Sequence, residues 1–212
     1  MLFITQPEER PDGYVVLSES TQWVRWLNRN IPQELDRQVR RRLISNLKHL
    51  LVGLELKAAL IYPHRLRSGA ERPVLYEPYF QNLILEFCVA TFSVMEGLGS
   101  AHWLSINGSS GADSPNVRRD RWLTALCVVY DGSGDAGLRG DVERTLSVRD
   151  RLHQDRVGAR ANIDWHAFSF EQAFAPASAA IRTIFRHDPE LVPETTNLSG
   201  EPGGPERPDP PE

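Results

Sequence analysis

Apolar residues recur at every third or fourth position over much of the chain, a spacing that predicts amphipathic α-helices. The first expected helix is "STQWVRWLNRN" at residues 20–30, with Ser20 or Thr21 as its N-terminal cap. A second is expected from about Pro32 to Tyr62, because proline suits a first helical turn and another proline follows the stretch. Its apolar side chains fall on one half of the helical wheel: Leu35, Val39, Leu43, Leu47, Leu50, Leu51 and Leu54.

A third helix, from about Leu75 to Trp103, is apolar nearly all round, which is typical of a central helix covered by others. The Gly-, Ser- and Asn-rich stretch at residues 105–116 predicts a surface loop. Three further helices are expected at residues 118–130, from 138 to 153 or 155, and at 169–187, the last opened by Ser169.

These elements predict an all-α fold, a single helical bundle at residues 20–187 preceded by a short arm at residues 1–19. Residues 188–212 hold seven of the 15 prolines and are expected to form a disordered acidic tail. The tail carries seven acids and one base, a net charge of −6, whereas residues 1–187 carry 23 bases against 21 acids, a net charge of +2. The body is thus nearly neutral, and its charge does not by itself require a polyanionic partner.

The two cysteines, Cys88 and Cys127, both lie inside apolar runs, which predicts buried free thiols and a reducing cytoplasm. No signal peptide and no membrane span are expected, because the N-terminus lacks a basic region and no apolar run is long enough. The chain has no phosphate-binding loop, dinucleotide fingerprint, nucleophile elbow or zinc motif, so neither a metal nor a cofactor is expected.

One polar pair departs from the ordinary pattern. In "SVRDRLHQD", residues 147–155, Arg149 and His153 fall in the middle of the apolar stripe that Leu138, Val142 and Leu146 define. A guanidinium at such a position is costly to desolvate unless it is paired or faces a cleft or a partner. Two interpretations follow. In the first, Arg149 forms a buried ion pair with an acid such as Glu86 or Glu96, and His153 is an ordinary helix-end residue. In the second, the pair lines a cleft, where Arg149 holds a phosphate while His153 moves a proton.

A bundle whose penultimate helix ends in Arg, a polar residue and then His resembles the HEPN superfamily. The resemblance covers residues 33–187 but rests on "RDRLHQD", which supplies Arg149, the polar Asp150 and His153. It implies a metal-independent endoribonuclease, often a toxin or an antiphage effector, with Arg149 and His153 as the catalytic residues. It also implies a homodimer whose two Arg/His pairs face a shared cleft, and an antitoxin or other defence-system protein as a partner.

The chain departs from the family pattern in its spacing. Only three residues separate Arg149 from His153, and the next position is Gln154, whose amide cannot exchange protons near neutral pH. Either His153 serves as the catalytic residue, or the chain is a catalytically inactive helical module that binds RNA or a protein partner.

Further arginines are candidate RNA contacts. "PNVRRDRW" places Arg118, Arg119 and Arg121 beside Trp122, an arrangement that can clamp and stack single-stranded RNA. The alternative is an ordinary helix start with Trp122 in the core. Arg151, on the solvated side of the Arg149 helix, is also taken as an RNA contact.

Overall fold

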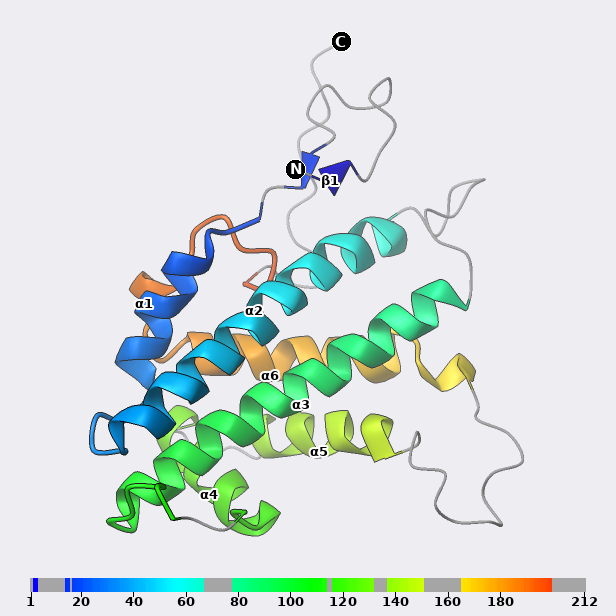
Figure 1. Ribbon diagram of the computed structural model, residues 1–212. Coiled ribbons are helices and arrows are strands. Elements are labelled where there is room, and N and C mark those ends of the chain that lie inside the picture. Colours follow the sequence, from blue (N-terminus) through cyan, green and yellow to red (C-terminus); the bar gives the residue numbers. More distant parts are fainter. Residues whose placement is uncertain are drawn as a thin grey trace.

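The computed structural model describes residues 2–3, 14–15, 17–66, 78–113, 116–131, 137–150 and 165–199. Over these ranges the fold is all-α, as the sequence predicts, and its helices pack as a bundle (Figure 1). The α-helices are α1 (Ser20–Asn30), α2 (Arg37–Leu66), α3 (Tyr79–Ile106), α4 (Arg119–Tyr130), α5 (Gly137–Asp150) and α6 (Ala175–Phe185). Shorter helical segments are η1 (Trp165–Ala167), η2 (Phe170–Phe174) and η3 (Pro189–Leu191), and strands β1 (Leu2–Phe3) and β2 (Tyr14–Val15) pair antiparallel.

The start of α1 lies where the apolar spacing predicts it, but its cap is Glu19 rather than Ser20 or Thr21. The Glu19 side chain accepts from the backbone of Gln22, and the Gln22 side chain accepts from the Glu19 N–H at 3.1 Å. This reciprocal capping satisfies two backbone donors that would otherwise lack a partner. The helix buries Trp23, Trp26 and other side chains against the rest of the bundle.

Helix α2 differs from the expected range at both ends. It begins at Arg37 rather than near Pro32, because Asp36 Oδ1 accepts from the backbone N–H groups of Gln38 and Val39, at 2.9 and 3.1 Å. It also continues past Pro63 to Leu66. A proline removes one backbone hydrogen-bond donor. Because Pro63 is close to the end of the helix, the loss of this one hydrogen bond does not prevent the last turn from forming.

Helix α3 is the central element, as its all-round apolar surface predicts. It packs against α2, α4, α5 and α6, and in Figure 1 it crosses the bundle between α2 and α5. Its contact with α4 is tight enough to require glycine: a Cβ at Gly99 would lie 2.5 Å from the Trp122 carbonyl oxygen. Among the described helices α3 alone is long and apolar enough to cross a membrane, and 56% of its most apolar stretch is buried inside the bundle.

A buried carboxylate joins three parts of the chain. Glu55 of α2 is fully buried and accepts from Ser18 N at 3.0 Å, from Ser18 Oγ at 2.6 Å and from Trp23 Nε1 at 3.1 Å. The Ser18 hydroxyl also lies 3.1 Å from Thr195 Oγ1. The beginning and the end of the bundle are thus held on the same helix.

The C-terminal segment is ordered further than its composition predicts. Residues 188–199, which we expected to belong to a disordered tail, include η3, and Leu198 is only 1% exposed within the hydrophobic core. The packed part of the chain therefore extends beyond residue 187 to Ser199, because Leu198 is buried in the core and Leu191 and Val192 pack against it. The remainder of the expected tail, residues 200–212, lies outside the described residues.

Candidate functional site

The helix that leads to the predicted catalytic pair has the expected buried face. Leu138 and Val142 are each 1% exposed, and Leu146 and Val148 are 7% and 3% exposed. Arg149 lies in the last turn of α5, one turn after the buried Thr145, but its side chain lies outside the described part of the structure. His153 and Arg151 also lie outside the described residues, so the proposed pairing of Arg149 with His153 stays a prediction.

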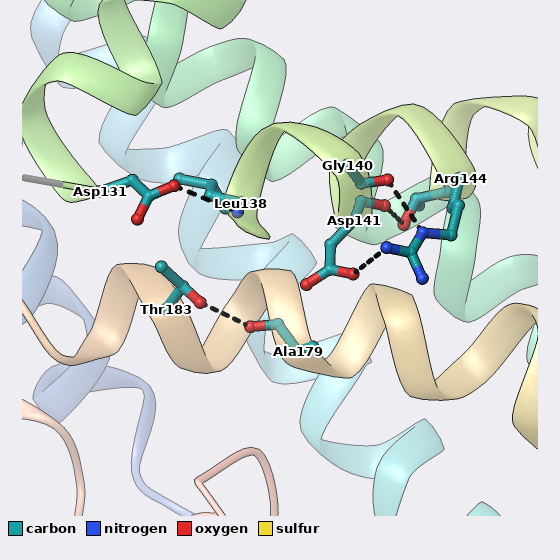
Figure 2. A network of polar contacts seen from close by, with 8 residues as sticks. Asp131, Leu138, Gly140, Asp141, Arg144, Ala179 and Thr183 are labelled. Atoms are coloured by element: carbon teal, nitrogen blue, oxygen red, sulfur yellow. Dashed lines mark hydrogen bonds and ion pairs between the residues drawn. The ribbon is translucent and has the colours of Figure 1, made fainter. Parts of the chain in front are cut away.

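Helix α5 packs against α3 and α6, and a polar contact joins its start to the end of α4 (Figure 2). Asp131, which follows α4, accepts from the backbone N–H of Leu138 at 3.2 Å and so caps the start of α5. The Asp141 carboxylate lies 3.6 Å from Arg144 Nη2, and burial raises the pKa of Asp141. Figure 2 shows Asp141 on the side of α5 that faces α6 near Ala179. The helix that carries Arg149 is therefore capped by the end of α4 and packed on α3 and α6.

The two acids proposed as buried partners for Arg149 lie at the surface of α3. Glu86 Oε2 is 3.6 Å from Lys57 Nζ, and the Glu86 side chain is 66% exposed. Glu96 is also exposed. Neither acid therefore offers the buried ion pair of the first interpretation.

The structure brings three predicted RNA contacts together at the start of α4. Arg118 is the N-cap residue, Arg119 and Arg121 follow in the first turn, and all three are exposed. Arg118 Nη2 lies 3.5 Å from Asp120 Oδ2, and hydrogen bonding to Arg118 holds the pKa of Asp120 below its usual range. These arginines lie roughly 15–20 Å along α4 from Asp131, at the opposite end of the helix.

The aromatic residue beside these arginines is not the one considered from the sequence. Trp122 is 1% exposed and packs edge-on against Phe92, with ring centroids 5.6 Å apart, so the core interpretation of Trp122 is confirmed. Instead, Arg121 Cζ lies 5.4 Å from the ring centroid of Trp103, in the last part of α3. A guanidinium over an indole face is a favourable cation–π contact.

Trp103 and Arg121 line a hollow of about 330 Å³ beneath the loop that joins α3 to α4. This volume is at the lower end of the range for small-molecule sites. The remaining lining residues are polar apart from one valine: Asn107, Ser109, Ser110, Asp113, Asn116 and Val117. Little in the sequence indicates this site, because Trp103 ends an apolar run and Arg121 lies 18 residues further along the chain. The two residues meet because α4 packs against α3.

The loop is fixed at several points. Ser110 O accepts from the Asp36 backbone N–H at 2.8 Å, and Ser105 Oγ donates to Glu34 Oε2 at 3.2 Å. Gly111 has a φ of +83°, a conformation that side-chain-bearing residues rarely adopt, and a Cβ there would lie 3.2 Å from Leu104 Cδ1. The hollow is therefore attached to both α2 and α3 rather than carried by an isolated loop.

A pair of titratable side chains that the sequence does not indicate lies between α3 and α4. The pair is His102 of α3 and Tyr130 at the end of α4. His102 Nε2 lies 3.1 Å from the Tyr130 hydroxyl, and the His187 ring packs edge-on with the Tyr130 ring, with centroids 5.2 Å apart. Burial, with a further contribution from His187, lowers the pKa of His102 to about 4. Burial also raises the pKa of the Tyr130 hydroxyl, so both groups are neutral near pH 7.

Comparison with known proteins gives no relative: no family model, no curated protein and no solved structure matches this chain. Within the described ranges, no three side chains of the types that bind metals come together as a site. The candidate functions are therefore argued from the residues themselves.

Proposed function

We propose that this protein binds single-stranded RNA and cleaves it without a metal ion. The observation that carries the proposal is the group of exposed Arg118, Arg119 and Arg121 beside the hollow, with Arg121 held over Trp103. Arginines neutralise phosphates, and aromatic or guanidinium planes stack on unpaired bases of any sequence. Single-stranded RNA presents phosphates and unstacked bases together, which matches this combination.

The cleavage part of the proposal rests on the motif at the end of α5 and on the family that the motif resembles. In this mechanism the 2′-OH of RNA attacks the adjacent phosphorus, and the 5′ oxygen of the next nucleotide leaves. His153 acts as general base or general acid in the proton transfers. Arg149 stabilises the charge that grows on the phosphoryl oxygens, for which its planar fork of donors is suited.

The products of this reaction are a 2′,3′-cyclic phosphate and a free 5′-hydroxyl, and DNA cannot react because it lacks the 2′-OH. As the resemblance implies, two copies of the chain are expected to form the shared cleft. A role as a toxin or antiphage effector in the cytoplasm, with an antitoxin or defence-system partner, belongs to the same proposal.

The test is to incubate the full chain with single-stranded RNA in EDTA and to look for cyclic-phosphate ends. His153→Ala and Arg149→Lys should each abolish cleavage, since a point charge does not replace a bidentate fork. Glu143→Gln, on the exposed side of the same helix, is the matched control and should cleave like wild type. Equal cleavage by wild type and His153→Ala would exclude this catalytic site.

An inactive RNA-binding module is the second candidate. It is favoured by the position of the arginine group on α4, because binding there does not require Arg149 or His153. Tight RNA binding by wild type, with no cleavage under any of these conditions, would establish this alternative.

A further inference from the structure

We infer that the hollow beneath the α3–α4 loop is a binding site for one guanine base of a single-stranded RNA. This inference rests on the proposed RNA binding and adds a base preference to it. It is argued from Trp103, Arg121 and Asp113, which line the same hollow.

The stacking surface of the site is the guanidinium of Arg121. Arg121 Cζ lies 5.4 Å from the Trp103 ring centroid, within the range of a cation–π contact, and both side chains line the hollow. Nucleic-acid bases stack on arginine planes as they do on aromatic rings. A base entering the hollow can therefore continue the stack begun by Trp103 and Arg121.

The polar wall of the hollow selects which base enters. Asp113 is exposed and, when ionised, can only accept hydrogen bonds. Guanine alone presents two adjacent donors on its Watson–Crick edge, N1–H and the N2 amino group, which match the two oxygens of a carboxylate. Adenine and cytosine place an acceptor beside their donor, and uracil places its single donor between two acceptors, so each sets an acceptor against the carboxylate.

The charges at the site favour a base inside and phosphates outside. A phosphate in the hollow would face Asp113, and like charges repel. At the rim, Arg118 and Arg119 are exposed at the start of α4, where they can reach the backbone phosphates on either side of the bound base. The Asn116 amide, which also lines the hollow, supplies donors suited to the guanine O6 acceptor.

The experiment measures binding of the full chain to fluorescent 2′-O-methyl oligonucleotides, which keep the bases and phosphates but cannot be cleaved through the 2′ position. Four octamers are compared, octauridine and octauridine with one central G, A or C. Wild type should bind the G-containing octamer about 10-fold more tightly than the other three. In Asp113→Asn this ratio should fall to near one, even if removal of the negative charge strengthens binding to all four.

Asp120→Asn is the matched control, because it removes the same charge from a residue that pairs with Arg118 and does not line the hollow. It should keep the preference for guanine. The melting temperatures of both variants are measured, and values equal to that of wild type show that the fold is intact. Free GMP and AMP are then added as competitors, and GMP should displace the G-containing octamer more strongly than AMP.

The failures of the two proposals are distinguishable. Equal binding of the four octamers by wild type, or a guanine preference that survives Asp113→Asn, would overturn the guanine site and leave RNA binding in place. No binding of any octamer, and none of GMP, would overturn both. Binding of GMP with no binding of octamers would identify a free nucleotide as the ligand and would contradict the RNA proposal.

Discussion

Arg121 of α4 lies over the indole of Trp103 in α3, with its guanidinium carbon 5.4 Å from the ring centroid. The contact joins the first turn of one helix to the last part of the helix before it in the chain. It places a cation and an aromatic ring side by side at the edge of a hollow, and the proposals for RNA depend on that pair.

We expect Arg121→Lys to weaken binding of single-stranded RNA by roughly 5- to 10-fold, because lysine keeps the charge but loses the plane. Arg119→Lys is the control, since Arg119 is exposed in the same turn and does not line the hollow, and it should change binding less than 2-fold. Fluorescence polarisation with labelled RNA at fixed salt measures both. Equal effects of the two substitutions would show that charge alone matters at this site.

Two glycine substitutions should change the free energy of unfolding in opposite directions. Gly99→Ala places a Cβ 2.5 Å from the Trp122 carbonyl oxygen and should lower the free energy of unfolding by about 1–3 kcal/mol. Gly53→Ala, in the interior of α2, meets only the end of the Lys57 side chain at 3.7 Å and should raise it by about 0.5–1 kcal/mol. Urea unfolding measures both, and a stabilising Gly99→Ala would contradict the close packing of α3 on α4.

Removing the buried carboxylate should be among the more destabilising single changes. Glu55→Ala leaves the donors of Ser18 and Trp23 without their acceptor, and we expect a loss of about 3 kcal/mol or more. Glu86→Ala removes an exposed carboxylate that pairs with Lys57 and should cost less than about 1 kcal/mol. Chemical denaturation of the two variants compares them, and similar losses would show that the Glu55 contacts do not hold the ends of the bundle.

The buried histidine predicts a loss of stability in mild acid. The pKa of His102 in the folded protein is about 4, below the ordinary value of 6.5, so the unfolded chain binds the proton more readily. The contribution of His102 to the free energy of unfolding is constant above pH 6.5. It decreases as the pH falls toward 4, and below pH 4 the free energy of unfolding has fallen by about 3 kcal/mol.

Acidic residues also titrate in this pH range and affect stability there. Replacing His102 by glutamine therefore separates the contribution of this histidine from theirs. The stability of His102→Gln should fall less between pH 7 and 4.5 than that of wild type. His49→Gln, at an exposed position of α2, should follow wild type. An identical pH profile for His102→Gln and wild type would contradict the buried neutral state of this imidazole.

Much of the fold could be predicted from the apolar spacing, because each helix buries a stripe that its own residues define. The range of α1 and the central position of α3 follow from local sequence alone. The start of α2 could not be placed, because the side chain of Asp36 competes with the conformational preference of Pro32 four residues earlier. The burial of Leu198 could not be predicted for a different reason. Composition is an average over a segment, and it does not indicate that one particular side chain packs into the core.

The candidate site was predictable only in part. The charge of Arg118, Arg119 and Arg121 is visible in the sequence, and their exposure follows from a helix start. The pairing of Arg121 with Trp103 depends on how closely α4 returns along α3, which Gly99 permits. Such a tertiary relationship has no periodicity to reveal it.

The contact between Ser18 and Thr195 spans 177 positions of the chain. A ribosome releases the N-terminal partner long before it has made the C-terminal one, so the nascent chain cannot complete this contact until synthesis has passed Thr195. Glu55 and Ser18 can meet earlier, whereas Leu198 can cover the core only after it has been synthesised as well. Closure of the bundle at this corner therefore follows the translation of Thr195 and cannot precede it.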